Sequence, residues 1–117
     1  MSTEPIIDLN TISELKATVG GDFIGELVDT YLEETPRLIA DLEPLLAKQE
    51  AEAFGRTAHS IKSSSASLGA LSFAALAKEL EMMGKSGDLA GAQPKVKRLA
   101  TDYAQVQSAL KELRDGS

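Results

Sequence analysis

The chain of 117 residues contains no cysteine and no tryptophan, and aromatic residues make up only 4% of it. The lack of cysteine excludes disulfides, thiolate metal ligands and a cysteine nucleophile. The shortage of aromatic residues leaves alanine and leucine to fill most of the core, which suits closely packed helices. No apolar run approaches the roughly 20 residues that cross a bilayer. Because Met-Ser-Thr-Glu-Pro also lacks the features of a signal peptide, we expect a cytoplasmic protein.

Charge and histidine content narrow the function further. Twelve basic and eighteen acidic residues give a net charge of −6, which argues against a broad nucleic-acid-binding surface. The single histidine cannot form a metal site with other histidines, and we expect no metal ion or cofactor bound by this chain. Apolar residues make up 43% of the chain, enough to form a core, so we expect one domain over residues 1–117.

The hydrophobic pattern has the period of helices and shows no sustained alternation typical of strands. A short helix is predicted from about residue 8 or 11 to residue 18, ended by the Gly20-Gly21 pair. Asp22 is the predicted N-cap of a second helix. Its apolar stripe runs through Ile24, Leu27, Tyr31, Leu38, Leu42 and Leu45.

Two prolines interrupt this second helix. A proline inside a helix removes one backbone donor and costs about 3 kcal/mol. The apolar stripe nevertheless keeps its register past Pro36 and Pro44. We therefore predict one long helix, bent near Pro36, over the alternative in which the helix breaks at Thr35 and Pro36 opens another.

Three further helices are predicted by the same periodicity. They cover about residues 50–68, residues 71–85, and a last segment that starts at Asp88 or at Gln93-Pro94. The last one has the most regular stripe, which consists of Val96, Leu99, Tyr103, Val106, Leu110 and Leu113. Because the connections are short, neighbouring helices should be antiparallel. The predicted fold is all-α, an antiparallel four-helix bundle with a short additional N-terminal helix.

The only histidine, His59, lies in the helix over residues 50–68. The buried stripe of this helix is predicted to consist of Phe54, Ala58, Ile61, Ser65 and Leu68. His59 follows Ala58 and lies about 100° around the helix from the stripe, so its side chain should face outward. Positions three, four or seven residues away share its face, and these are Gly55, Arg56, Lys62, Ser63 and Ala66. Small and cationic neighbours suit an anion carried on the imidazole.

The motif around His59 points to a known family. Ala58-His59-x-Ile61-Lys62, a run of small residues and Leu68-Gly69-Ala70 resemble the histidine-containing phosphotransfer (HPt) domains of multistep two-component phosphorelays. The resemblance covers most of the chain in helix length and order, but its specific residues lie between Ala58 and Ala70. The family usually has glycine four residues after the histidine, where this chain has Ser63. We expect this serine to reduce a partner's access to the imidazole.

The resemblance implies a phosphocarrier that has no ATP site of its own. His59 would accept a phosphoryl group on Nε2 from a receiver-domain aspartate and pass it to another receiver, and Lys62 would stabilise the phosphoryl group. Gly55, Arg56 and Ser63 would support the site, although Arg56 has an alternative partner in Glu52. The partners would be receiver domains of response regulators or hybrid sensor histidine kinases, with Mg²⁺ on the receiver. The protein is expected to be a monomer that contacts its partners through Ile12, Phe23, Leu27 and Ala66.

Two alternatives stay open from the residues alone. A degenerate HPt domain could dock a receiver or kinase without being phosphorylated, and Ser63 in place of glycine favours this reading. The dimerisation domain of a sensor kinase is a weaker rival, because its His-Glu-x-x-Arg-Thr-Pro type of box is absent.

The acidic residues Glu33-Glu34, Glu79 and Glu81 are interpreted as solvated helix faces.

Overall fold

The computed structural model describes residues 6–116, and over these residues the only regular elements are five helices. They are α1 (Leu9–Val19), α2 (Gly21–Ala47), α3 (Ala51–Ser67), α4 (Leu71–Ser86) and α5 (Ala92–Gly116). The all-α prediction is confirmed, and the helix boundaries agree with the predicted ones to within a few residues. Residues 1–5 and 117 of the predicted domain lie outside the described residues.

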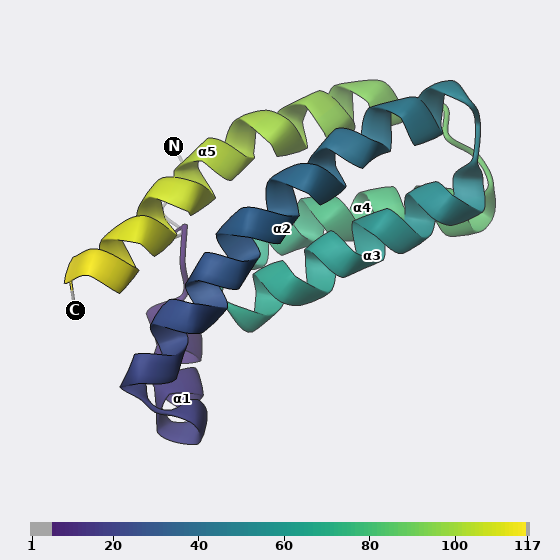
Figure 1. The fold of residues 1–117 in the computed structure, drawn as a ribbon. Helices are drawn as coiled ribbons and strands as arrows, with labels where there is room; N and C mark the ends of the chain where they lie inside the picture. The colour runs from purple at the N-terminus through teal and green to yellow at the C-terminus, as the bar shows by residue number, and fades with distance from the viewer. Residues whose placement is uncertain (1–5, 117) are drawn as a thin grey trace.

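The four long helices form an antiparallel bundle (Figure 1). Each of α2, α3 and α4 packs against the next helix in the chain, and α5 closes the ring against α2. The most extensive contact is between α3 and α4. The short α1 packs against α2 at the end of the bundle where α2 begins (Figure 1). Among the described helices, none has the length and apolar character that a membrane span requires.

Helix α1 is held by its N-cap residue and by a loop of the bundle. Asp8 is its N-cap, with Oδ2 accepting from the backbone N–H of Thr11 at 3.2 Å. The Asp8 N–H donates to the carbonyl of Gly69 at 2.8 Å, which ties α1 to the turn between α3 and α4. Gly69 has a φ of 82°, and a Cβ there would lie 2.9 Å from the Asp8 carbonyl oxygen, so only glycine fits without strain.

Helix α2 starts earlier than predicted and runs without a break. Gly20 occupies the N-cap position, so the prediction of Asp22 as the N-cap was wrong; Asp22 lies in the first turn, where its negative charge suits the helix dipole. The helix contains both Pro36 and Pro44, which confirms one long helix and excludes the break at Thr35. Both prolines are exposed, so water can reach the carbonyls one turn earlier that lost their donors.

The core follows the predicted stripe of α3 and that of α5 up to Leu110, but in α2 it departs from the prediction. Val28 and Ile39 are buried there, whereas the predicted Leu27, Leu38 and Leu45 are half-buried at the edge. Neighbouring apolar positions fit a period of 3.6 almost equally well, so the pattern alone placed the centre of the stripe one residue off. In α3 the whole predicted stripe is buried, namely Phe54, Ala58, Ile61, Ser65 and Leu68.

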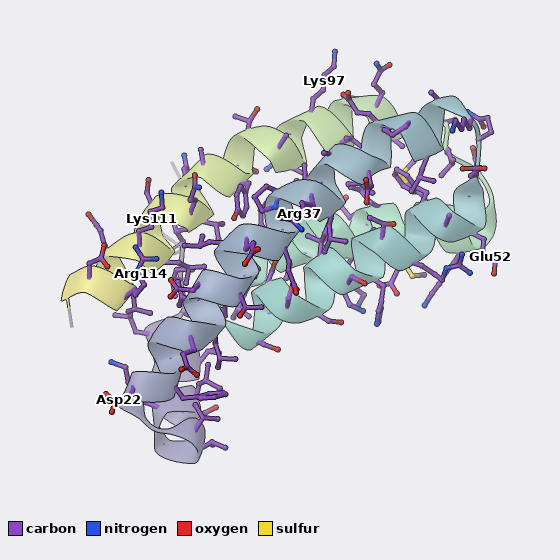
Figure 2. All side chains as sticks on the ribbon, viewed as in Figure 1. Asp22, Arg37, Glu52, Lys97, Lys111 and Arg114 are labelled. Atoms are coloured by element: carbon purple, nitrogen blue, oxygen red, sulfur yellow. The ribbon has the colours of Figure 1, made fainter. Side chains whose placement is uncertain are left out.

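Polar contacts fasten α2 to its neighbours. The buried Ser65 hydroxyl on α3 lies 2.7 Å from the Tyr31 hydroxyl on α2, so both groups have a partner in the core. Near the C-terminal end of α5, Arg114 Nη1 lies 2.7 Å from Asp29 Oδ1 of α2. Arg114 is labelled in Figure 2, where Lys97 extends from the bundle toward solvent.

Candidate functional site

A close crossing of two helices builds the site. A Cβ on Gly84 of α4 would lie 2.5 Å from the Gly55 Cα of α3 and 2.8 Å from the Ala51 carbonyl oxygen. The backbones of α3 and α4 therefore touch, and any side chain at position 84 would force them apart. His59 lies one turn after Gly55, and Glu81 lies one turn before Gly84. The crossing thus brings these two side chains together.

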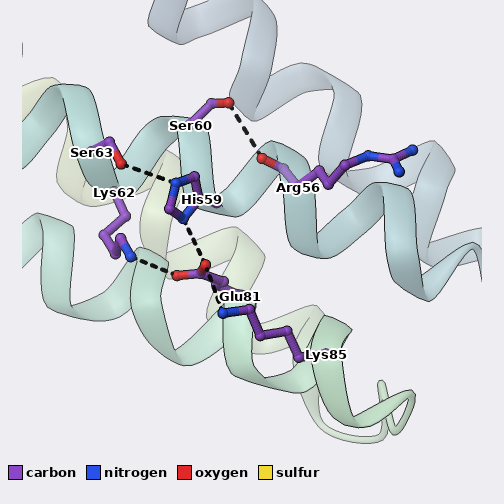
Figure 3. Close-up of polar contacts among 7 residues, drawn as sticks. All are labelled: Arg56, His59, Ser60, Lys62, Ser63, Glu81 and Lys85. Atoms are coloured by element: carbon purple, nitrogen blue, oxygen red, sulfur yellow. Dashed lines mark hydrogen bonds and ion pairs between the residues drawn. The ribbon is translucent and has the colours of Figure 1, made fainter.

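The imidazole of His59 is held from below by a buried carboxylate (Figure 3). Its Nδ1 lies 2.7 Å from Glu81 Oε2, and the His59 side chain is 55% exposed, as the helical spacing predicted. Glu81 is only 3% exposed. The interpretation of Glu81 as part of a solvated face was therefore wrong, because this position of α4 faces α3 and not water.

Two lysines complete the surroundings of Glu81. Lys62 Nζ lies 2.9 Å from Oε1, and Lys85 Nζ lies 3.4 Å from Oε2 (Figure 3). The hydrogen bond from Lys62 is the largest influence on the Glu81 pKa; it outweighs the opposing effect of burial and, with the bonds from His59 and Lys85, lowers that pKa from 4.5 to about 2. Glu81 is therefore ionised at neutral pH.

An ionised carboxylate can only accept hydrogen bonds, so the contact with Glu81 requires the hydrogen of His59 to be on Nδ1. In a neutral imidazole this leaves the lone pair on Nε2. Ser63 Oγ lies 3.4 Å from Nε2, on the exposed side of α3. The result is an imidazole with one nitrogen anchored in the protein and a nucleophilic nitrogen at the surface.

The other predicted site residues have different surroundings. Lys62 is 28% exposed and bound to Glu81, next to the imidazole. The Arg56 guanidinium instead bonds Glu52 at 3.0 Å and points away from His59 in Figure 3, which is the alternative that its spacing allowed. Gly55 is buried at the helix crossing, where it allows the close contact between the two backbones, and it also lines the open space beside His59.

A hollow of about 670 Å³ lies beside the imidazole, between α3 and α4. Its lining includes His59, Arg56, Glu81, Gly84 and Lys85. The hollow leaves space at the surface next to the anchored imidazole, with two cationic side chains at its edge.

The residues predicted to contact a partner are not equally available. Phe23 is 46% exposed, and Leu27 and Ala66 are half-buried. Ile12 is only 3% exposed because it packs into the core from α1, so the structure does not place its side chain on an open surface. Phe23 thus provides the large apolar side chain among the predicted contact residues.

The sequence reasoning missed Glu81, Lys85 and Gly84. The prediction of a helix over residues 71–85 gave Gly84 no packing role, although this glycine lies inside α4. A glycine within a helix is a signal of close backbone approach, and pairing it with Gly55 would have placed α4 against the His59 helix. The position of Glu81 under the imidazole would have followed from that pairing.

Comparisons with known proteins agree with this fold. The model of the Hpt domain family matches residues 26–114. Among solved structures, the chain is similar to histidine-containing phosphotransfer protein B (HptB) from Pseudomonas aeruginosa PAO1, with 26% sequence identity and a TM-score of 0.88 over 98% of this chain and 99% of that chain. No curated protein matches the chain. The family match spans the His59 helix, and the structural similarity extends over nearly the whole chain.

Proposed function

Because this chain belongs to the Hpt domain family, and hence has a histidine phosphotransfer role in phosphorelays, we propose that His59 is the residue that carries the phosphoryl group. In this proposal, Nε2 accepts the group from the aspartyl phosphate of one receiver domain and gives it to the aspartate of another. The protein acts as a carrier without an ATP site or cofactor of its own, and Mg²⁺ comes with the receiver.

The observation that carries this proposal is the contact between Nδ1 of His59 and the buried carboxylate of Glu81. It fixes the ring and keeps the lone pair on Nε2 at the surface. When Nε2 forms a bond to phosphorus, the bond between phosphorus and the aspartate oxygen breaks, and the aspartate leaves as a carboxylate. The ring becomes positively charged because Nδ1 keeps its proton. Glu81 neutralises that charge at the point where it develops.

The lysines around Glu81 supply the positive charge that a phosphoryl group needs. An ammonium group has three donors, so Lys62 can keep its bond to Glu81 and still donate to a phosphoryl oxygen. We propose this role for Lys62, with Lys85 as a second cation at the same carboxylate. Arg56 is less suited, because its guanidinium is paired with Glu52.

The proposed partners are receiver domains of response regulators or hybrid sensor histidine kinases. The exposed Phe23, with Leu27 and Ala66, supplies apolar surface for such a partner. We also propose that the chain acts as a cytoplasmic monomer and does not bind nucleic acid. These proposals follow from the family resemblance and from the acidic composition.

One observation favours a second function. Ser63 places a hydroxyl 3.4 Å from Nε2, where the family usually has glycine. If this group blocks the receiver's active site, the protein would dock a receiver without accepting phosphate.

Phosphoryl transfer decides between the two functions. Wild type and His59→Gln are incubated with a phosphorylated receiver and Mg²⁺, and acid-labile, alkali-stable phosphate on this chain is measured. Glutamine can still donate a hydrogen bond to Glu81, so the variant should keep the fold, which circular dichroism checks. We expect label on the wild type only. Equal labelling of both chains would refute His59 as the acceptor. Receiver binding without labelling of the wild type would support the docking function.

A further inference from the structure

The hydroxyl groups on α3 show a regular pattern with two exceptions. Most of them donate to the carbonyl one turn earlier on the same helix, as Ser and Thr commonly do in helices. These bonds join Thr57 to Ala53, Ser60 to Arg56, Ser64 to Ser60 and Ser67 to Ser63, at 2.9–3.3 Å. The buried Ser65 bonds Tyr31 instead. Ser63 alone in this helix turns its hydroxyl toward Nε2 of His59.

The distance from Ser63 Oγ to Nε2, 3.4 Å, is at the long end of the hydrogen-bond range. Since Nδ1 carries the hydrogen of the imidazole, Nε2 is the acceptor and the hydroxyl is the donor. This bond is weak in the unmodified protein. A phosphoryl group on Nε2 would place negatively charged oxygens in front of the ring, on the side where Ser63 already points.

We propose that Ser63 is a positioning residue for the phosphoryl group, donating weakly to Nε2 in the unmodified protein and strongly to a phosphoryl oxygen after transfer. This inference rests on the proposed function of His59. The transfer step itself is unchanged: the bond from phosphorus to the aspartate oxygen breaks, and the bond to Nε2 forms. The hydroxyl rotates about the Cα–Cβ and Cβ–Oγ bonds from one acceptor to the other, and no proton is transferred.

Two effects of the serine can be separated. A hydrogen bond to a charged oxygen is stronger than one to a neutral nitrogen, so the hydroxyl should favour the phosphorylated state. For an exposed group, the change in the transfer equilibrium constant should be about two- to tenfold. The Cβ and hydroxyl also occupy space that glycine would leave open to the receiver, so they should slow transfer in both directions without changing the equilibrium.

Four variants test this proposal. Ser63→Ala removes the hydroxyl and keeps the Cβ, whereas Ser63→Gly removes both. Ser63→Thr keeps a hydroxyl, and Ser67→Ala is the matched control, because this serine is exposed on the same helix and bonds only a backbone carbonyl. The transfer equilibrium and the forward rate are measured for each variant against the same phosphorylated receiver, with thermal unfolding as the check of the fold.

We expect Ser63→Ala and Ser63→Gly to shift the equilibrium toward the receiver by the same factor of about two to ten. Ser63→Gly should transfer faster than Ser63→Ala, and Ser63→Thr should keep the equilibrium near that of the wild type. An equilibrium that does not move in Ser63→Ala, or that moves as much in Ser67→Ala, would overturn the role of Ser63. That result leaves His59 as the acceptor, whereas an unlabelled wild type refutes the proposed function itself.

Discussion

The replacement Glu81→Gln tests the buried carboxylate on which the site depends. Glutamine keeps the length of the side chain and one oxygen that can accept from His59 Nδ1, but it loses the charge. The pKa of Glu81 falls from 4.5 to about 2 on folding, which corresponds to about 3 kcal/mol of stability. The side chains of His59 and Lys85 are 55% and 65% exposed, so water screens part of this interaction. We therefore expect Glu81→Gln to lower the free energy of unfolding by about 1–2 kcal/mol at pH 7.

The effect should depend on pH in a defined direction. The folded state holds the proton of Glu81 less tightly than the unfolded state, because its pKa is lowered by folding. The stabilisation is therefore fully present above about pH 5, decreases as the pH falls from 4.5 toward 2, and is lost below about pH 2. At pH 3, less than half of the difference between wild type and Glu81→Gln should remain.

Urea unfolding followed by circular dichroism at pH 7 and pH 3 measures this difference. Glu79→Gln is the matched control, because Glu79 lies on the same helix and pairs with Lys95 at 2.9 Å while 56% of its side chain is exposed. Glu79→Gln should lower the free energy of unfolding by less than about 0.5 kcal/mol at both pH values. If Glu81→Gln lost the same free energy of unfolding at pH 7 and at pH 3, the assignment of an ionised, buried Glu81 would be refuted. The same conclusion would follow if Glu79→Gln lost as much free energy of unfolding as Glu81→Gln.

Three other predictions, two of them paired with a control variant, follow from particular residues. Gly84→Ala should lower the free energy of unfolding by about 1–3 kcal/mol, because its Cβ would lie 2.5 Å from the α3 backbone. Gly25→Ala, whose Cβ would meet only one side-chain atom at 3.9 Å, should instead raise it by about 0.5–1 kcal/mol in the same urea experiment. Tyr31→Phe should cost about 1–2 kcal/mol, because it leaves a buried serine hydroxyl without its partner. Tyr103→Phe should cost nothing measurable, since the Tyr103 hydroxyl is buried without a hydrogen-bond partner among the described residues. Phe23→Ala should slow phosphoryl transfer from a receiver about fivefold or more at subsaturating concentration, with the fold intact; an unchanged rate would remove Phe23 from the docking surface.

Helix periodicity was sufficient to predict the architecture. Stripes at steps of three and four residues predicted the five helices, the buried face of α3 with Ser65 in it, and the continuity of α2 past Pro36. These features depend on which positions share a helix face, and residue spacing determines that directly. Where two apolar residues are adjacent, as with Leu27 and Val28, spacing does not decide which of them lies at the centre of the buried stripe. Only the packing of the neighbouring helices showed that Val28 is the buried one.

For the site, the sequence by itself determined that His59 faces outward and that its motif resembles the HPt family. It did not determine what holds the ring. Glu81 is 22 residues away from His59, and its own helix pattern does not distinguish it from an exposed acidic residue. Its place under the imidazole depends on the angle and depth at which α3 and α4 cross, and the contact between Gly55 and Gly84 sets both. Such a contact joins two helix faces through space, so only the tertiary structure could show that the carboxylate is buried, ionised and bonded to Nδ1.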